Sequence, residues 1–94
     1  MYFILSYQTV DGFIEKRQPH RAEHLEKVQA AVARGEMLLG GAITDQEGGA
    51  MMIFQTDDPL TVESFARQDP YVLSGLVSNW MIRPWAVVVG TKMD

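Results

Sequence analysis

The segments of this chain that most resemble β-strands carry apolar side chains on both of their faces. In residues 2–5, Phe3 and Leu5 point to one side of the strand, whereas Tyr2 and Ile4 point to the other. The same double pattern recurs farther along the chain, in residues 51–54 and 86–89. A strand of an antiparallel sheet with one solvated face would alternate apolar with polar residues. Both faces of the sheet that these strands form must therefore be covered.

Periodicity and turn signals predict one domain over residues 1–94, with the element order strand, helix, strand, strand, helix, strand. Asp58-Pro59 and Asp69-Pro70 each combine a capping aspartate with a first-turn proline. The predicted elements are strand 2–8, a helix from about 19 to 34, strands 37–43 and 50–55, a helix from 59, a short helical segment 70–76 and a final strand within 79–90. This order is the α+β, ferredoxin-like βαββαβ arrangement.

The two helices of a βαββαβ unit lie on one face of its sheet, so they leave the other face open. Since that face is also apolar in this sequence, something else has to cover it. A second copy of the chain is the simplest candidate. The strand pattern therefore favours a homodimer that is packed sheet to sheet.

Composition excludes several classes of protein. The 94 residues contain no cysteine, which removes disulfides, thiolate nucleophiles and cysteine-bound metal sites. Eight Lys and Arg against twelve Asp and Glu give a formal net charge of −4, which argues against nucleic acids and anionic membranes as partners. The apolar run 2–5 lacks preceding basic residues and is too short for an export signal or a membrane span. We therefore expect a cytoplasmic protein.

Histidine occurs at positions 20 and 24, and this spacing would place both side chains on one face of the first helix. Such a pair can hold a metal, with Asp69 as a conceivable third ligand. However, no glutamate follows His20 directly and no cysteine is available, so solvated histidines are the simpler interpretation. The glycine pairs at 40–41 and 48–49 match no nucleotide-binding fingerprint. We expect neither a metal nor a cofactor.

Two arginines, Arg17 and Arg21, stand four residues apart near the start of the first helix. Like charges at this spacing repel each other, and cations oppose the positive end of the helix dipole. A bound anion, such as a substrate carboxylate or phenolate, would relieve both problems. Ion pairs with Glu15 or Glu23 are the alternative explanation.

The Asp69-Pro70-Tyr71 motif can be explained as a helix cap alone. A capping aspartate at a corner between helices can also direct its carboxylate at a histidine. That contact fixes the tautomer of the imidazole and raises its basicity, as general-base catalysis requires. Tyr71 could stack on a substrate or fill the core. The residues alone leave these alternatives open.

Taken together, these residues resemble the YCII-related, or YciI-like, protein family. The most specific parts of this resemblance are the Arg-x-x-His-Leu element and the later Asp-Pro-Tyr element. The resemblance extends from Tyr2 to about Gly90 and is carried by Arg17, Arg21-Ala22-Glu23-His24-Leu25, Gly40-Gly41-Ala42, Asp69-Pro70-Tyr71 and Arg83-Pro84-Trp85.

The resemblance implies a dimeric α+β barrel, in which two ferredoxin-like sheets face each other. It also implies a His–Asp dyad in a pocket, which corresponds to His24 and Asp69 in this chain. The family arginines correspond to Arg17 and Arg21, whereas His20 is not part of the family pattern. Relatives are associated with lyase-like chemistry, including dehydrochlorination of hydroxylated aromatic compounds.

The leading hypothesis is a small cofactor-independent enzyme that performs acid/base chemistry on a small anionic or phenolic compound. His24 would be the acid/base, Asp69 would orient it, and Arg17, Arg21 and Tyr71 would bind the substrate. The alternatives are a non-catalytic module that binds a small molecule in the same pocket, and a purely structural dimer. The enzyme hypothesis requires a His24 nitrogen within about 3.2 Å of an Asp69 oxygen, beside a cavity.

An isolated monomer would expose a wide apolar sheet face, so we predict that the chain is a homodimer at micromolar concentration. Sedimentation equilibrium should give twice the 10.6 kDa mass of the chain. A stable monomer at that concentration would contradict the sheet-to-sheet packing.

Overall fold

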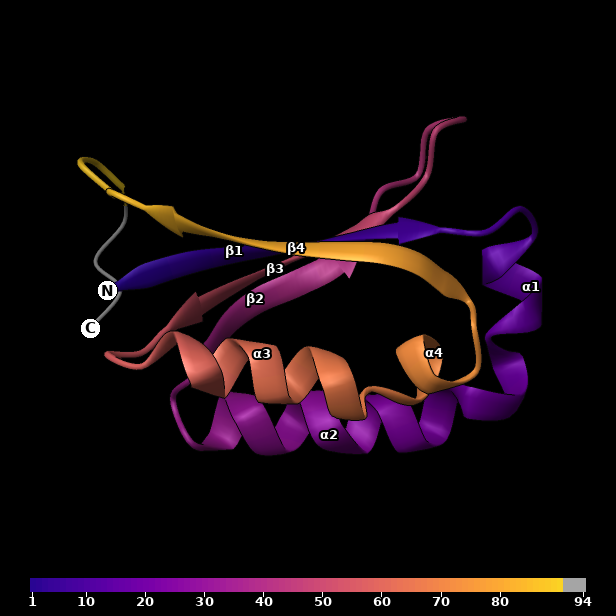
Figure 1. The fold of residues 1–94 in the computed structure, drawn as a ribbon, viewed down its shortest axis with the longest axis horizontal. Coiled ribbons are helices and arrows are strands. Elements are labelled where there is room, and N and C mark those ends of the chain that lie inside the picture. Colours follow the sequence, from indigo (N-terminus) through magenta and orange to yellow (C-terminus); the bar gives the residue numbers. More distant parts are fainter. Residues whose placement is uncertain (91–94) are drawn as a thin grey trace.

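A four-stranded antiparallel sheet forms the centre of the computed structural model, which describes residues 1–90 (Figure 1). Its strands lie in the spatial order β2-β3-β1-β4, so the first and third strands of the chain are central. This order is that of a split βαββαβ unit and confirms the predicted α+β, ferredoxin-like fold. The strands are β1 (Tyr2–Thr9), β2 (Met37–Ala42), β3 (Ala50–Gln55) and β4 (Val77–Trp85).

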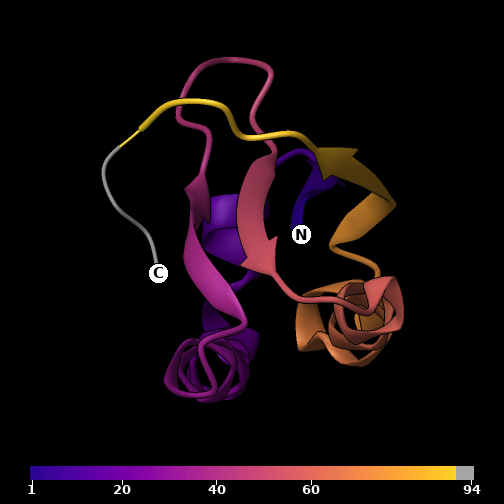
Figure 2. The same cartoon turned by 90° about the vertical axis from the view of Figure 1, so that its left-hand side faces the viewer.

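The longer helices cover one face of this sheet, and a short helix lies at its end (Figures 1 and 2). None of the helices within residues 1–90 is long and apolar enough to cross a membrane. The helical segments are α1 (Phe13–Lys16), the 3₁₀ turn η1 (Gln18–His20), α2 (Arg21–Ala33), α3 (Pro59–Gln68) and α4 (Pro70–Leu73).

The segment before α2 differs from the prediction of one helix that begins near Pro19. α1 ends at Lys16, and a separate 3₁₀ turn carries Pro19 in its first turn, so α2 begins only at Arg21. Proline lacks the N–H that a continuous helix needs and restricts the residue before it, which interrupts the helix here. Arg17 consequently lies in the connection between α1 and η1, whereas Arg21 is the first residue of α2.

The last strand is shorter than predicted, because β4 ends at Trp85 rather than near Gly90. Its neighbour β1 begins at Tyr2, and Tyr2 already pairs with Trp85. Residues 86–90 therefore have no adjacent strand with which to form backbone hydrogen bonds. Val88 and Val89 are accordingly 88% and 85% exposed. The helix α4 also ends earlier than predicted, at Leu73 rather than near residue 76.

The hydrophobic core lies between the sheet and the helices. Phe3, Leu5 and Tyr7 alternate along β1 and are buried on the side of the helices. They pair with Phe54, Met52 and Ala50 on β3. Against this side of the sheet, α3 buries Val62, Phe65 and Ala66.

The second long helix, α2, packs less completely than the sequence pattern indicates. It buries only Ala31, and the apolar Val32 is 50% exposed. Leu25 and Val28 do point toward the sheet, but they line a cavity instead of a close-packed core. This end of α2 therefore leaves space between itself and the sheet.

The face of the sheet opposite the helices is uncovered within the described part of the chain (Figure 2). Strand alternation places Ile4, Met51 and Met81 on this face, where Met51 and Met81 are 40% and 53% exposed. Leu39 and Trp85 on the two outer strands are also exposed. The single chain thus leaves open the apolar face on which the homodimer prediction depends.

Two glycines with positive φ offer a matched test of the backbone beside Tyr7. A Cβ added to Gly49, at φ +97°, would lie 2.8 Å from the Tyr7 carbonyl oxygen, whereas one added to Gly35, at φ +77°, would have nothing within 4 Å. Gly35→Ala should lower the free energy of unfolding by about 1–2 kcal/mol, which is the cost of the left-handed conformation alone. Gly49→Ala should cost at least about 1 kcal/mol more, because the clash adds to that strain. Urea unfolding measures both values, and equal losses would contradict the close contact.

Candidate active site

Asp69 occupies the corner between α3 and α4 and is fully buried, with 0% of its surface exposed. Its extended backbone ends α3, and its side chain caps α4 by accepting a hydrogen bond from the Tyr71 N–H at 3.0 Å. Pro70 fits the first position of α4 because a proline there forgoes no helical hydrogen bond. The local sequence Asp-Pro therefore fixes this carboxylate inside the protein, as the cap signal indicates.

The Asp69 carboxylate accepts two further hydrogen bonds from side chains that come from distant elements. His24 on α2 places its Nδ1 2.8 Å from Oδ1, and the Tyr7 hydroxyl on β1 lies 2.7 Å from Oδ2. Both carboxylate oxygens thus face donors. The contact between His24 and Asp69 that the sequence predicts is present, and it lies beside a cavity.

The geometry selects one tautomer of His24. Because the carboxylate already accepts from the Tyr7 O–H and the Tyr71 N–H, the His24 Nδ1 carries hydrogen and donates to Oδ1. In the neutral imidazole, Nε2 then holds a lone pair and has no hydrogen. The side chain of His24 is 13% exposed and lines the cavity. Such a ring can remove a proton from a bound molecule and return it.

Aromatic contacts hold the imidazole in place. The ring of Tyr71 stacks on His24 with ring centroids 3.9 Å apart and an interplanar angle of 16°. Phe13 in turn meets Tyr71 edge to face at 5.2 Å and 87°. The stack and the Asp69 hydrogen bond restrict both χ angles of His24, as a preorganised catalytic group requires. Tyr71 therefore packs on the dyad, with only 2% of its surface exposed.

Tyr7 belongs to this site, although sequence reasoning did not select it. Burial, followed by the nearby charge and hydrogen bond of Asp69, raises the pKa of the Tyr7 phenol far above its ordinary value. The hydroxyl consequently stays protonated and donates to Asp69. A signal was available, because Tyr7 falls in the inward set of β1 and a buried phenol needs a hydrogen-bond partner.

The cavity beside the dyad has a volume of about 360 Å³ and exists because small residues face the helices at this end of the sheet. Gly40, Ala42 and Ala50 occupy these positions on β2 and β3, and Ala42 pairs directly with Ala50. A Cβ at Gly40 would lie 2.8 Å from Met52 Cγ. The remaining walls are Phe13, Leu25, Val28, Met37, Met52, Tyr7, Tyr71, His24, Arg17 and Arg21, with Gly41 and Thr44 at the edge.

Both predicted arginines line this cavity. Arg17 places its guanidinium over the Phe13 ring, 5.6 Å from the centroid, and its Nε is buried without a hydrogen-bond partner in the described chain. Within residues 1–90, neither arginine forms an ion pair with Glu15 or Glu23. The geometry thus gives no support to the alternative that Arg17 and Arg21 form ion pairs with these glutamates.

His20 lies apart from these residues. It ends the 3₁₀ turn η1 before α2 begins, and it does not line the dyad cavity as His24 does. In the part of the chain that the structure describes, no group of three His, Cys, Asp or Glu side chains could hold a metal ion.

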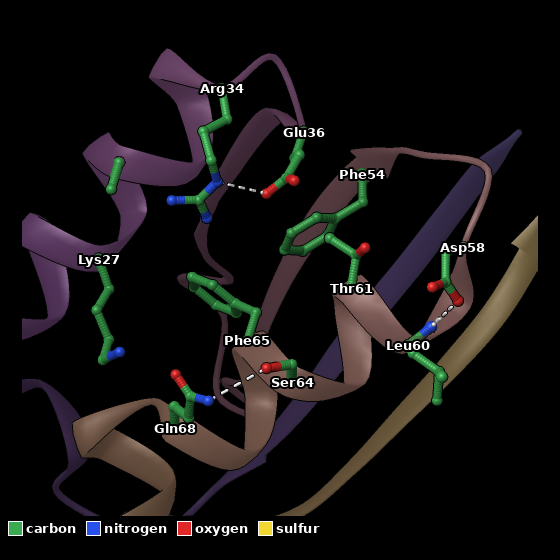
Figure 3. A pocket seen from close by; sticks show the side chains of 11 residues that line it. Lys27, Arg34, Glu36, Phe54, Asp58, Leu60, Thr61, Ser64, Phe65 and Gln68 are labelled. Atoms are coloured by element: carbon green, nitrogen blue, oxygen red, sulfur yellow. Dashed lines mark hydrogen bonds and ion pairs between the residues drawn. The ribbon is translucent and has the colours of Figure 1, made fainter.

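A second cavity, of about 490 Å³, lies between α2 and α3 (Figure 3). It contains none of the predicted site residues, and several of its polar side chains form hydrogen bonds within the protein. Arg34 donates to Glu36 at 2.8 Å, and Gln68 donates to Ser64 at 3.2 Å. Asp58 accepts from the N–H of Leu60 at 2.9 Å, as the cap of α3. The cavity beside the dyad is therefore the better candidate for chemistry.

Comparison with known proteins confirms the family resemblance. The family model for the YCII-related domain matches residues 1–86. The chain belongs to the YCII-related family. An uncharacterized protein of Haemophilus influenzae is 28% identical over 97 aligned positions, which cover 94% of this chain and 99% of that protein.

A solved structure with the same fold is that of 5-chloro-2-hydroxyhydroquinone dehydrochlorinase from Burkholderia phenoliruptrix AC1100, in complex with 2,5-dihydroxybenzoquinone. It superimposes with a TM-score of 0.76 and covers 92% of this chain and 94% of its own, at 23% sequence identity. This likeness establishes the fold that this YCII-related chain shares with the dehydrochlorinase.

The raised pKa of Tyr7 predicts how stability changes in alkali. In the unfolded chain Tyr7 ionises near its ordinary pKa of about 10, whereas in the folded chain it stays protonated. The stabilisation that comes from the protonated Tyr7 is therefore complete below about pH 10. Above that pH the free energy of unfolding falls, by up to about 1.4 kcal/mol per pH unit. Urea unfolding between pH 9 and about 11 should show a shallower decline for Tyr7→Phe than for the natural chain. Parallel declines in the two proteins would contradict the buried, protonated phenol.

Proposed function

We propose that this YCII-related protein is a small cofactor-independent enzyme in which His24 acts as acid and base. The observation that carries the proposal is the 2.8 Å contact between His24 Nδ1 and the buried Asp69 carboxylate, beside a cavity that the imidazole lines. Asp69 orients the ring and stabilises the imidazolium that forms when Nε2 takes a proton. The stack on Tyr71 and the hydrogen bond from Tyr7 hold both members of the dyad in place.

Proton abstraction followed by elimination or isomerisation fits this arrangement. Nε2 removes a proton from a carbon or oxygen of the substrate and returns it to the product or the leaving group. The substrate is a small anionic or phenolic compound, which Arg17, Arg21 and Tyr71 bind. The dehydrochlorinase of the same fold acts on a chlorinated hydroxyhydroquinone and was solved with a dihydroxybenzoquinone, which supports lyase chemistry on such compounds as one form of the proposal.

The active protein is a cytoplasmic homodimer in this proposal. A second copy would cover the apolar sheet face that carries Met51, Met81 and Trp85, which are 40%, 53% and 45% exposed. The dyad lies on the other side of the sheet, among the helices. His24 and Asp69 consequently meet within one chain, so each protomer carries its own acid/base pair.

The enzyme proposal predicts that His24→Ala abolishes turnover in a screen of phenolic and carboxylic metabolites. A positioned general acid/base contributes about 10²–10⁴-fold to a rate, so kcat should fall by that factor. His20→Ala is the matched control, because it removes the same side chain outside the cavity and should leave kcat unchanged. Ala42→Leu, which fills the cavity without contacting the dyad hydrogen bonds, should raise KM or remove activity.

Asp69→Asn separates the orienting role from the cap. Asparagine caps about as well as aspartate, so α4 should persist. The amide cannot hold the imidazole as firmly in the Nδ1–H tautomer, so kcat should fall while circular dichroism stays unchanged. Nitrogen NMR of His24 reports the tautomer directly. Binding of a metabolite without turnover in the natural chain would instead support the non-catalytic binding module.

A further inference from the structure

Two polar side-chain atoms are buried in the described chain without a hydrogen-bond partner, and both belong to residues that line the dyad cavity. They are Nε of Arg17 and the hydroxyl of Tyr71. Buried polar groups are nearly always hydrogen-bonded in folded proteins, so an orphan pair at one cavity calls for an explanation. By contrast, no buried side-chain atom in the described lining of the cavity between α2 and α3 lacks a partner, and Arg34, Asp58 and Gln68 form hydrogen bonds there (Figure 3).

The chemistry of the two atoms defines what would satisfy them. Arg17 Nε–H can only donate, and the Tyr71 hydroxyl can donate while its ring remains stacked on His24. A single acceptor oxygen would fulfil both. Because Arg17 carries a positive charge and forms no ion pair within residues 1–90, a negatively charged oxygen fits better than a neutral one. Arg21 at the same cavity adds to the preference.

The rest of the cavity sets the shape of the molecule that carries this oxygen. Phe13, Leu25, Met37 and Met52 present apolar surface, and no carboxylate lines the space. A volume of about 360 Å³ lies near the lower end of the range for ligand pockets, which suits a small ring compound. These walls suit an apolar ring in the centre of the cavity, with an oxygen directed toward Arg17 and Tyr71.

We propose that the cavity binds a compact conjugated acid in its ionised form, with the oxyanion held by Arg17 Nε–H and the Tyr71 O–H. The inference rests on the proposed function in placing the ligand beside the dyad, and it adds the ionisation state and the groups that select it. Tyr71 acts as a hydrogen-bond donor to the ligand as well as a support for His24. Phenols and aromatic carboxylic acids share this chemistry, so the experiment separates the two sources.

The test uses 4-nitrophenol, whose coloured phenolate reports its own ionisation, and benzoate as the carboxylate probe. The bound phenolate should be favoured over the neutral phenol by about tenfold or more, equivalent to a fall of one unit in the apparent pKa of the probe, or about 1.4 kcal/mol. Tyr71→Phe keeps the stacked ring and removes only the hydroxyl. Arg17→Lys keeps the charge and removes Nε–H. Each should reduce the preference about three- to tenfold, whereas Arg34→Lys, at the other cavity, should not.

The outcomes are distinct. Binding of the phenolate that depends on Tyr71 and Arg17 assigns a phenol, and the same dependence for benzoate alone assigns a carboxylic acid. Equal binding of the neutral phenol and its anion, or no binding of either probe, would overturn the inference, and solvent would then satisfy the two groups. If none of the variants loses turnover while the preference for the bound anion persists, only the proposed function is overturned.

Discussion

A buried carboxylate organises this protein. Asp69 has no exposed surface, yet it accepts hydrogen bonds from β1 through Tyr7, from α2 through His24 and from the first turn of α4 through the Tyr71 N–H. An ion placed in the interior is costly unless its oxygens are satisfied, and here three elements that are distant in the sequence converge to satisfy them. The same contacts that make the buried charge tolerable also fix the imidazole, so the stability of the corner and the geometry of the dyad depend on one group.

The structure shows how far the sequence could predict this arrangement. The Asp-Pro signals located the starts of α3 and α4 because capping depends on adjacent residues. The break at Pro19 and the end of β4 at Trp85 were missed, since the first needs the geometry of α1 and the second needs the register against Tyr2. The partnership of Tyr7 with Asp69 joins residues 62 positions apart, and no local pattern reveals such a contact.

Packing explains why the dyad cavity forms at its own end of the sheet. Phe3 and Phe54 pair near the end where α3 packs, and Phe65 closes on Phe54 with ring centroids 5.3 Å apart. At the other end, Ala42 and Ala50 leave the space that Tyr7 and α2 do not fill. The large residues therefore pack against one another, whereas the small residues leave the space for the dyad cavity. The sequence contained both sets, but only the register shows that they occupy opposite ends of one face.

The dyad and the open apolar surface lie on opposite faces of the same strand. In β1, Phe3, Leu5 and Tyr7 point to the helices and the dyad, whereas Ile4 lies on the open face with Met51 and Met81 close by. A strand with period-two alternation can present two independent surfaces because neighbouring side chains point in opposite directions. The face of β1 toward the helices is apolar because it forms the core and carries the hydrogen bond from Tyr7 to Asp69. The apolar residues of the other face are not required by this core, so the two apolar faces that distinguish the sequence have separate causes.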